Sequence, residues 1–240
     1  MNLKKLVRLF FAPLKRWKID HFSNARVSYS QCGEDLIISQ LLLQLGIQDI
    51  RYLDIGAHHP SYLSNTYLFY QEGGSGVCIE PDPVLHRNFP KMRPRDIHLN
   101  CGVGIDDGLA DFFVMSTPTL NTFSEKEASE YAASGKYLIT QKLKIEIQNV
   151  NRIIKNNFSI CPNLVSLDVE GWDLVVLSSF DFEKYRPQVF CVETLSFTED
   201  KSERKLNEII EFMHSKNYLT HADTYINTIF VDRSAWEARR

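Results

Sequence analysis

The sequence predicts an α/β fold, in which a mostly parallel sheet is covered by helices on both faces and ends in an antiparallel pair of strands. From residue 29 onward, strand-like segments alternate with helix-like segments, which is typical of parallel strands connected by crossover helices. The last two strand-like segments, 218–222 and 228–231, are separated by only a short connection. Such a connection cannot cross the sheet, so these two strands are expected to run antiparallel.

Strands are expected where apolar and β-branched residues form short runs. They are Arg51–Ile55, Gly76–Glu80, Ile97–Cys101, Ala110–Met115, Leu164–Val169, Val189–Glu193, Tyr218–Ala222 and Thr228–Val231. Helices are expected in the segments between them, where the periodicity changes. They are Gly33–Leu45, Leu63–Glu72, Pro83–Pro90, Glu125–Ala133, Glu146–Asn156, Trp172–Ser179 and Ser202–Lys216.

Charge divides the chain into two parts. Its 240 residues, 44% hydrophobic and 24% charged, suit one soluble globular domain. Residues 1–20 hold six of the 27 basic residues and one of the 30 acidic ones, so the remainder is acidic. We therefore predict a basic N-terminal segment over residues 1–28 and one domain over residues 29–240. The acidic domain gives no reason to expect a nucleic-acid partner.

The N-terminal segment has the pattern of an amphipathic helix. Seven apolar residues recur at spacings of three and four: Leu3, Leu6, Val7, Phe10, Phe11, Leu14 and Trp17. An apolar face beside basic residues is typical of a helix that lies on an anionic membrane surface, and Pro13 should kink it. No uncharged run is long enough to span a membrane. We expect peripheral contact with the inner face of the membrane; the alternative is packing against the domain or a second subunit.

The cysteines indicate a reducing compartment. There are five, at positions 32, 78, 101, 161 and 191, with no CxxC pair and no spacing typical of a metal site. We interpret them as reduced thiols, several of them in the core, of a cytoplasmic protein.

Three consecutive strand ends carry polar residues or glycine. Asp54 and Gly56 end the first strand, Glu80 ends the second, and Gly102 follows the third. In parallel sheets, ligands bind at the carboxyl ends of the strands, and an acid at the second strand end can accept two hydrogen bonds from a ribose diol. Gly56 would allow a ligand to approach the backbone. The sequence therefore predicts a nucleoside-binding site.

These blocks, with others, resemble the FkbM-type methyltransferases over roughly residues 29–231. The resemblance is carried by "YSQCGEDLII" (29–38), "LDIGAHHP" (53–60), "SNTYLFY" (64–70), "CIEPDP" (78–83), "NCGVG" (100–104), "SLDVEGWDLVVLSSFDF" (166–182) and "KYRPQVFCVET" (184–194). It implies a Rossmann-like class I methyltransferase sandwich with a seven-stranded sheet. It also implies S-adenosylmethionine (SAM) as cofactor and methyl transfer to a hydroxyl, often on a sugar or polyketide.

The resemblance also assigns cofactor-binding residues. It places the "LDIGA" turn, with Asp54, Gly56, Ala57 and His58, around the methionine end of the cofactor. His58 stands where the usual loop has a third glycine. The remaining expected contacts are the ribose acid Glu80 with its neighbour Pro81, Gly102 at the third strand end, Gln31 in the segment that would fold over the cofactor, and Asn65.

Methyl transfer to a hydroxyl needs a general base or a metal that lowers the hydroxyl pKa. Asp168 and Glu170 would point to one face if their strand continued through them. We expect Asp168, Glu170 and His59 to be catalytic, with His58 and Glu193 as further candidates. The histidines could instead cap the following helix, and Glu170 could complement a helix dipole. Clustered acids could also bind Mg²⁺ or Mn²⁺.

Two other functions share this fold. A nicotinamide-dependent oxidoreductase would want a GxGxxG turn for the pyrophosphate, and "GAHHPS" lacks it. A non-catalytic binding module would not need the acids at four positions, 54, 80, 168 and 170. Neither alternative is removed by sequence alone, and the sequence does not identify the methyl acceptor.

Overall fold

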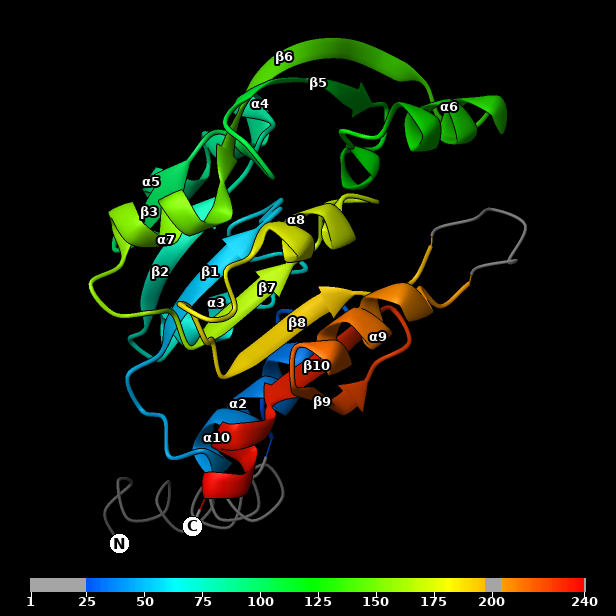
Figure 1. Cartoon of the computed structure of the whole chain (residues 1–240). Coiled ribbons are helices and arrows are strands. Elements are labelled where there is room, and N and C mark those ends of the chain that lie inside the picture. The colour runs from blue at the N-terminus through cyan, green and yellow to red at the C-terminus, as the bar shows by residue number, and fades with distance from the viewer. Residues whose placement is uncertain (1–24, 197–203, 240) are drawn as a thin grey trace, which may run out of the picture.

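The predicted seven-stranded sheet is present. The computed structural model describes residues 25–196 and 204–239, so the amphipathic helix predicted near the N-terminus and most of the 1–28 segment lie outside it (Figure 1). The strands lie in the order β3 (Ile97–Leu99), β2 (Ser75–Ile79), β1 (Arg51–Ile55), β7 (Leu164–Leu167), β8 (Val189–Glu193), β10 (Asn227–Asp232) and β9 (Tyr218–Asp223). The first five are parallel, whereas β10 is antiparallel to both β8 and β9, which confirms the predicted fold class.

Helices cover both faces of this sheet because successive strand residues point to opposite sides. Leu53 and Ile55 of β1 pack with α7 (Val150–Asn157), α8 (Asp173–Ser179) and α9 (Asn207–Ser215). Tyr52, from the same strand, belongs to the opposite core. The elements packed there are α2 (Glu34–Gln44), α3 (Tyr67–Gln71), α5 (Phe89–Met92) and α10 (Arg233–Ala238). The short helix α4 (Pro83–His86) begins at Asp82, whose side chain accepts hydrogen bonds from the Val84 and Leu85 backbone.

A second sheet arches beyond the carboxyl ends of β1, β7 and β8 (Figure 1). Its strands lie in the order β4 (Gly102–Gly104), β6 (Ile139–Asn149) and β5 (Gly108–Met115). The connection from β5 to β6 contains a 3₁₀ turn, η1 (Pro118–Leu120), and α6 (Glu125–Ala133). We call residues 102–149 the arm.

The arm corrects two predictions. The predicted helix Glu146–Asn156 is wrong at its start, because β6 continues to Asn149 and α7 begins at Val150. The segment "KLKIEIQ" alternates charged and apolar residues, which is the period of a strand, and Ile145 and Ile147 are buried. The predicted strand Ile97–Cys101 ends at Leu99, because the chain leaves the main sheet there to form β4.

Other predicted helices are shorter or divided in the structure. The helix expected from Leu63 begins at Tyr67, the one expected over Pro83–Pro90 is divided into α4 and α5, and α9 begins at Asn207. All five thiols are free, with Cys78, Cys101 and Cys191 buried as expected. Within the described ranges, no helix has the length and apolar character needed to cross a membrane.

Candidate active site

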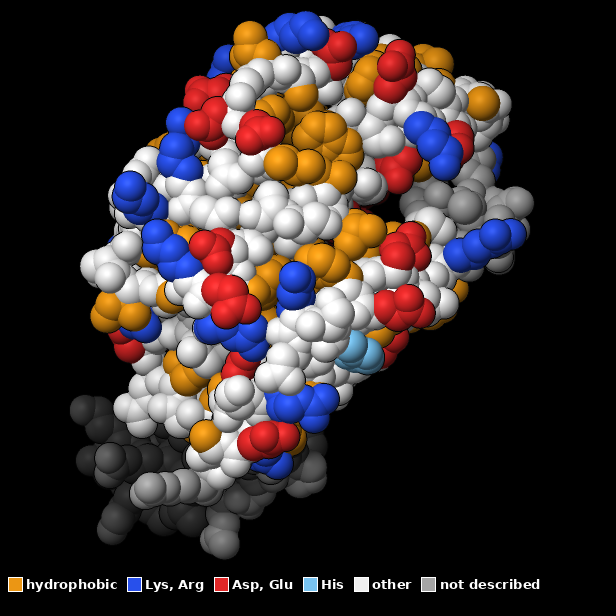
Figure 2. Space-filling model, in the orientation of Figure 1, with side chains coloured by type: hydrophobic (Ala, Val, Ile, Leu, Met, Phe, Trp, Pro, Cys, Tyr) orange, Lys and Arg blue, Asp and Glu red, His pale blue; other side chains and the backbone are white. Residues whose placement is uncertain are grey.

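A cavity of about 570 Å³ opens between the carboxyl ends of the parallel strands and the arm. Most of the residues predicted from sequence line it: Gln31, Asp54, Gly56, Ala57, His58, Asn65, Glu80, Pro81, Asp168, Glu170 and Glu193. The arm adds an apolar wall that includes Phe112, Leu120 and Phe123. On the face drawn in Figure 2, hydrophobic side chains gather beneath the arch of the arm.

Gly56 allows the ends of β1 and β7 to touch. Its φ of 78° lies in the left-handed region, and a Cβ there would stand 1.8 Å from the Asp168 carbonyl oxygen. The glycine is therefore required by the approach of another backbone segment. Sequence reasoning assigned the space to a ligand.

His58 adopts a backbone conformation that favours glycine. Its φ is 50°, which explains why a glycine is usual at this position of the loop. Its backbone N–H donates to Glu80 Oε2 at 2.8 Å, so the loop after β1 is bonded to the end of β2.

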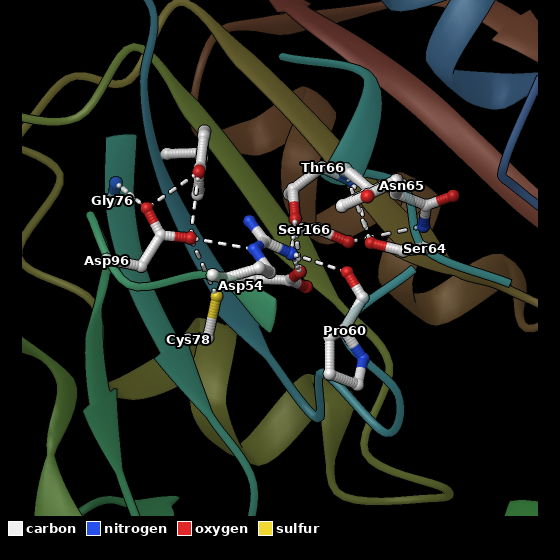
Figure 3. Close-up of polar contacts among 12 residues, drawn as sticks. Asp54, Pro60, Ser64, Asn65, Thr66, Gly76, Cys78, Asp96 and Ser166 are labelled. Carbon is white, nitrogen blue, oxygen red and sulfur yellow. Dashed lines mark hydrogen bonds and ion pairs between the residues drawn. The ribbon is translucent and has the colours of Figure 1, made fainter. Parts of the chain in front are cut away.

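Asp54 is buried within a polar network as well as lining the cavity. Its Oδ2 accepts a hydrogen bond from Thr66 Oγ1 at 2.5 Å and lies 3.8 Å from Arg93 Nη1 (Figure 3). Burial raises the pKa of Asp54, while Arg93 and Thr66 act in the opposite direction. Asn65, which follows in the same loop, donates to Ser166 Oγ of β7 at 3.2 Å.

Glu80 is held by two backbone donors, one for each carboxylate oxygen. His58 N–H contacts Oε2, and Asp82 N–H contacts Oε1 at 2.7 Å. Each oxygen keeps a second lone pair, which suits the pair of hydroxyls of a ribose diol. Burial raises the pKa of Glu80 to about 8.

Three acids converge at the ends of β7 and β8. One carboxylate oxygen from each of Asp168, Glu170 and Glu193 lies within 4.8 Å of the other two. The strand predicted over Leu164–Val169 ends at Leu167, so Asp168 and Glu170 are not brought together by sharing one face of a strand. A turn brings them together instead, with φ of 48° at Glu170 and 91° at Gly171.

These acids retain protons at higher pH than usual. Burial raises the pKa of Asp168 to about 6, although a hydrogen bond with Glu193 opposes the shift. Burial, and then Asp168, raise the pKa values of Glu170 and Glu193 well above their usual range. A carboxyl in a cavity with a pKa of about 6, as Asp168 has, is suited to accept a proton near neutral pH.

The arm places two residues beside the three acids, and sequence reasoning missed both. Tyr131 of α6 donates to Glu170 Oε2 at 3.3 Å. Glu127, one turn earlier, packs so close to Gly171 that a Cβ there would lie 2.1 Å from its Oε1. Burial, and then Glu130, raise the pKa of Glu127 to about 7. Only the folded arm brings these residues near Glu170, and no local pattern marks them.

His59 and Gly102 do not line the cavity. His59 Nδ1 accepts hydrogen bonds from the backbone N–H groups of Ser61 and Tyr62, at 3.1 and 2.9 Å. It therefore bonds to the loop before α3 and does not cap that helix, which begins at Tyr67. Gly102 lies in β4, where a Cβ would stand 2.5 Å from the Phe123 ring and 2.6 Å from Ile147. Packing between the arm strands and Phe123 therefore explains this glycine.

Comparison with known proteins identifies one sequence family. Residues 54–220 match the profile of the methyltransferase FkbM domain. No curated protein is similar enough in sequence to count as a relative.

Several solved methyltransferase structures are distantly similar. A TehB-like SAM-dependent methyltransferase from Corynebacterium glutamicum has a TM-score of 0.43 and 9% identity, over 92% of this chain and 96% of its own. The 1,6-didemethyltoxoflavin-N1-methyltransferase of Burkholderia thailandensis, solved with S-adenosylhomocysteine, has a TM-score of 0.42 and 10% identity, over 93% and 88%. The precorrin-6y C5,15-methyltransferase of Geobacter metallireducens has 0.39 and 12%, over 80% and 85%. The family assignment depends on the sequence match.

Replacing Gly56 with alanine should disrupt the site. A left-handed φ costs a residue with a Cβ about 1–2 kcal/mol, and the contact with Asp168 should add at least as much. Gly46→Ala is a matched control, because Gly46 has a φ of 71° and open space around its Cβ position. Urea unfolding should show a clearly larger loss for Gly56→Ala; equal losses would contradict the close contact.

The cofactor-free protein should lose stability as the pH rises from about 5 to 8. Acids whose pKa is raised by folding stabilise the fold fully below their unfolded pKa and lose this contribution as the pH passes their folded pKa, here about 6 for Asp168, 7 for Glu127 and 8 for Glu80. Glu127→Gln should therefore recover about 1–2 kcal/mol at pH 8, a value reduced for partial exposure. The control is Glu211→Gln, an exposed position. Identical pH slopes in Glu127→Gln and wild type would disprove this assignment.

Proposed function

The chain belongs to the family of FkbM-domain methyltransferases, and we propose that this SAM-dependent enzyme methylates a hydroxyl group, most simply a sugar hydroxyl of a cell-surface glycan or its lipid-linked precursor. The observation that carries the proposal is the cluster of Asp168, Glu170 and Glu193 beside the glycine turn after β1. A hydroxyl is a poor nucleophile until a base accepts its proton, and this cluster offers carboxylates for that purpose.

The cavity suits SAM better than a dinucleotide. Its described lining contains five carboxylates and no Lys or Arg. SAM carries a sulfonium and an ammonium, which acids stabilise, whereas the same acids would repel a pyrophosphate. The two lone pairs left on Glu80 fit the ribose. These features favour a methyltransferase over the nicotinamide-dependent alternative.

The residues of this chain would bind the cofactor, orient it and the acceptor, and remove the proton of the acceptor hydroxyl. SAM supplies a methyl group that its sulfonium already activates. Gly56, Ala57 and His58 would hold the methionine end, with Gln31 and Asn65 beside it. The acceptor oxygen would form its bond to the methyl carbon as the carbon–sulfur bond breaks, and its proton would pass to Asp168 or Glu170. Alignment of the two reactants supplies much of the rate.

The walls of the cavity support a small-molecule acceptor with apolar and hydroxyl-bearing faces. The arm side is apolar, with Phe112, Leu120 and Phe123, and the sheet side is acidic. Tyr62 and Tyr225 also contribute to the lining and keep 62% and 61% of their surface exposed. Aromatic surface with a few placed polar groups is typical of small-molecule sites.

Binding a divalent cation is a second candidate role for the same acids. Oxygen ligands within 4.8 Å of one another suit Mg²⁺ or Mn²⁺, which could orient the acceptor and lower the pKa of its hydroxyl. In this alternative, the acids bind the metal and do not accept the proton directly.

Asp168→Asn should lower turnover by about 100-fold or more, because the carboxylate that accepts the proton or stabilises charge is removed. Glu170→Gln tests its neighbour in the same way. Turnover can be followed as S-adenosylhomocysteine release with a panel of monosaccharide glycosides, with the exposed Asp181→Asn as the matched control.

The outcomes separate the alternatives. Full activity in both acid variants contradicts the site. Loss of activity with chelator and its return with Mg²⁺ or Mn²⁺ favours the metal role. Cofactor binding without transfer to any hydroxyl-bearing acceptor would contradict the proposed function.

We also propose that residues 1–20 hold the enzyme at the inner face of the membrane. Each basic residue near an anionic surface contributes about 1 kcal/mol, and the segment contains six. Deleting residues 1–20 should move the protein from sedimenting anionic vesicles to the supernatant while methyl transfer to a soluble acceptor persists. Equal sedimentation of both forms, or unfolding of the truncated form, would show that the segment packs on protein.

A further inference from the structure

A buried arginine, which no sequence motif marks, lies behind the cofactor side of the cavity. Arg93 has no exposed surface, and its Nε donates to Asp96 Oδ2 at 2.7 Å. Its guanidinium lies over the rings of Tyr52 and Tyr70, at 5.1 and 5.4 Å from their centroids. Burying such a charge costs several kcal/mol before its partners compensate.

Stability alone does not explain Arg93. Its Nη2 is buried without a hydrogen-bond partner, which makes the burial more expensive still. Well-packed apolar residues are commonly as stabilising as a buried ion pair. The remaining contacts of Arg93 therefore indicate what the charge is for.

Those contacts are with Asp54, which lines the cavity, and with two residues of the loop that follows it. Nη1 donates to Thr66 Oγ1 at 3.0 Å and to the Pro60 carbonyl at 3.4 Å, and it lies 3.8 Å from Asp54 Oδ2. Thr66 in turn donates to Asp54. One nitrogen thus connects both the acid at the end of β1 and the loop over residues 56–66, which provides much of the cavity lining.

The loop needs such support because its backbone is strained. His58 and Leu63 have φ of 50° and 54°, although neither is glycine. Conformations of this kind persist only when the surrounding structure fixes them. Arg93 contacts Asp54, two residues before this loop, Pro60 near its middle and Thr66 at its end.

Asp96 anchors the arginine to the sheet. Its carboxylate accepts hydrogen bonds from Tyr52 Oη at 2.8 and 2.9 Å and from the Gly76 backbone at 2.9 Å. Tyr52 belongs to β1 and Gly76 to β2. Figure 3 shows Asp96 and Cys78 on one side of Asp54. Thr66, Asn65 and Ser166 lie on its other side.

We propose that Arg93 is a positioning residue for the cofactor, which fixes the loop over residues 56–66 and the Asp54 carboxylate relative to the sheet. It does not touch the cavity and acts through Thr66, Pro60 and Asp54. The proposal concerns cofactor binding, so it rests on SAM dependence and not on which acceptor is methylated.

The test is the affinity for S-adenosylhomocysteine, measured by calorimetry without an acceptor. Arg93→Lys keeps the charge beside Asp96 but cannot keep every contact of the planar guanidinium, and the affinity should fall about 10-fold or more, the usual effect of losing a partner that orients a ligand-binding group. Arg186→Lys is the control, because Arg186 also pairs with an aspartate, Asp232, and lies over a tyrosine ring, Tyr218, but does not line the cavity. Its affinity should stay within about twofold of wild type even if stability falls.

A second pair of variants decides the question if Arg93→Lys does not fold. Thr66→Val removes the hydroxyl between Arg93 and Asp54 while keeping the side-chain size, and it should weaken binding by about 10-fold. Thr66→Ser restores the hydroxyl and should recover most of the affinity. Wild-type affinity in folded Arg93→Lys or in Thr66→Val, or equal losses in both threonine variants, would overturn the proposal. Absence of binding to the wild type would overturn the cofactor assignment and this role with it.

Discussion

The backbone contact between the end of β1 and the turn after β7 is the constraint on which the site depends. Asp168 N–H donates to the Ile55 carbonyl at 3.1 Å, and Gly56 leaves room for the Asp168 carbonyl. On the other side of β1, the N–H groups of Gly56 and Ala57 both donate to the Ile79 carbonyl of β2. Three strand ends are thereby joined through main-chain atoms. The turn after β1 and the acids are consequently held together through main-chain atoms, which suits the precise alignment that methyl transfer requires.

The acids of the site lie close together although their negative charges repel one another. Asp168, Glu170 and Glu193 repel one another, and burial removes the water that would screen them. The fold compensates with donors, among them Tyr131 Oη for Glu170 and two backbone N–H groups for Glu80. These donors do not fully offset the repulsion and the burial, so the acids still favour protons or bound positive charge. A cationic cofactor therefore stabilises the same arrangement that destabilises the empty protein at high pH.

The parts of the molecule predicted from sequence are those encoded locally. Asp54 lies one residue before the end of a short apolar run and Glu80 ends another, and the order of such runs sets their place along one sheet edge. The arm was only partly predicted, because the end of "KLKIEIQ", from Glu146, was assigned to a helix and its first residues to no element, and because β4 has only three residues. Glu127, Tyr131 and Arg93 were missed for a different reason. Their roles come from contacts with residues 27 to 44 positions away along the chain, which no local periodicity reports.

The two sides of the cavity are stabilised by different kinds of interaction, so a substitution on one side need not disturb the other. The side proposed to hold the cofactor is attached to the main sheet, through main-chain bonds and the buried network around Asp96. The arm side rests on aromatic packing, in which Phe123 contacts Phe112 and Trp172 with centroid distances of 4.7 and 5.2 Å. Side-chain packing tolerates substitutions of similar volume better than a buried ion network tolerates loss of a partner. Under the proposed function, the arm would therefore be the wall whose shape can change without disturbing the cofactor, and the acceptor would fit against it.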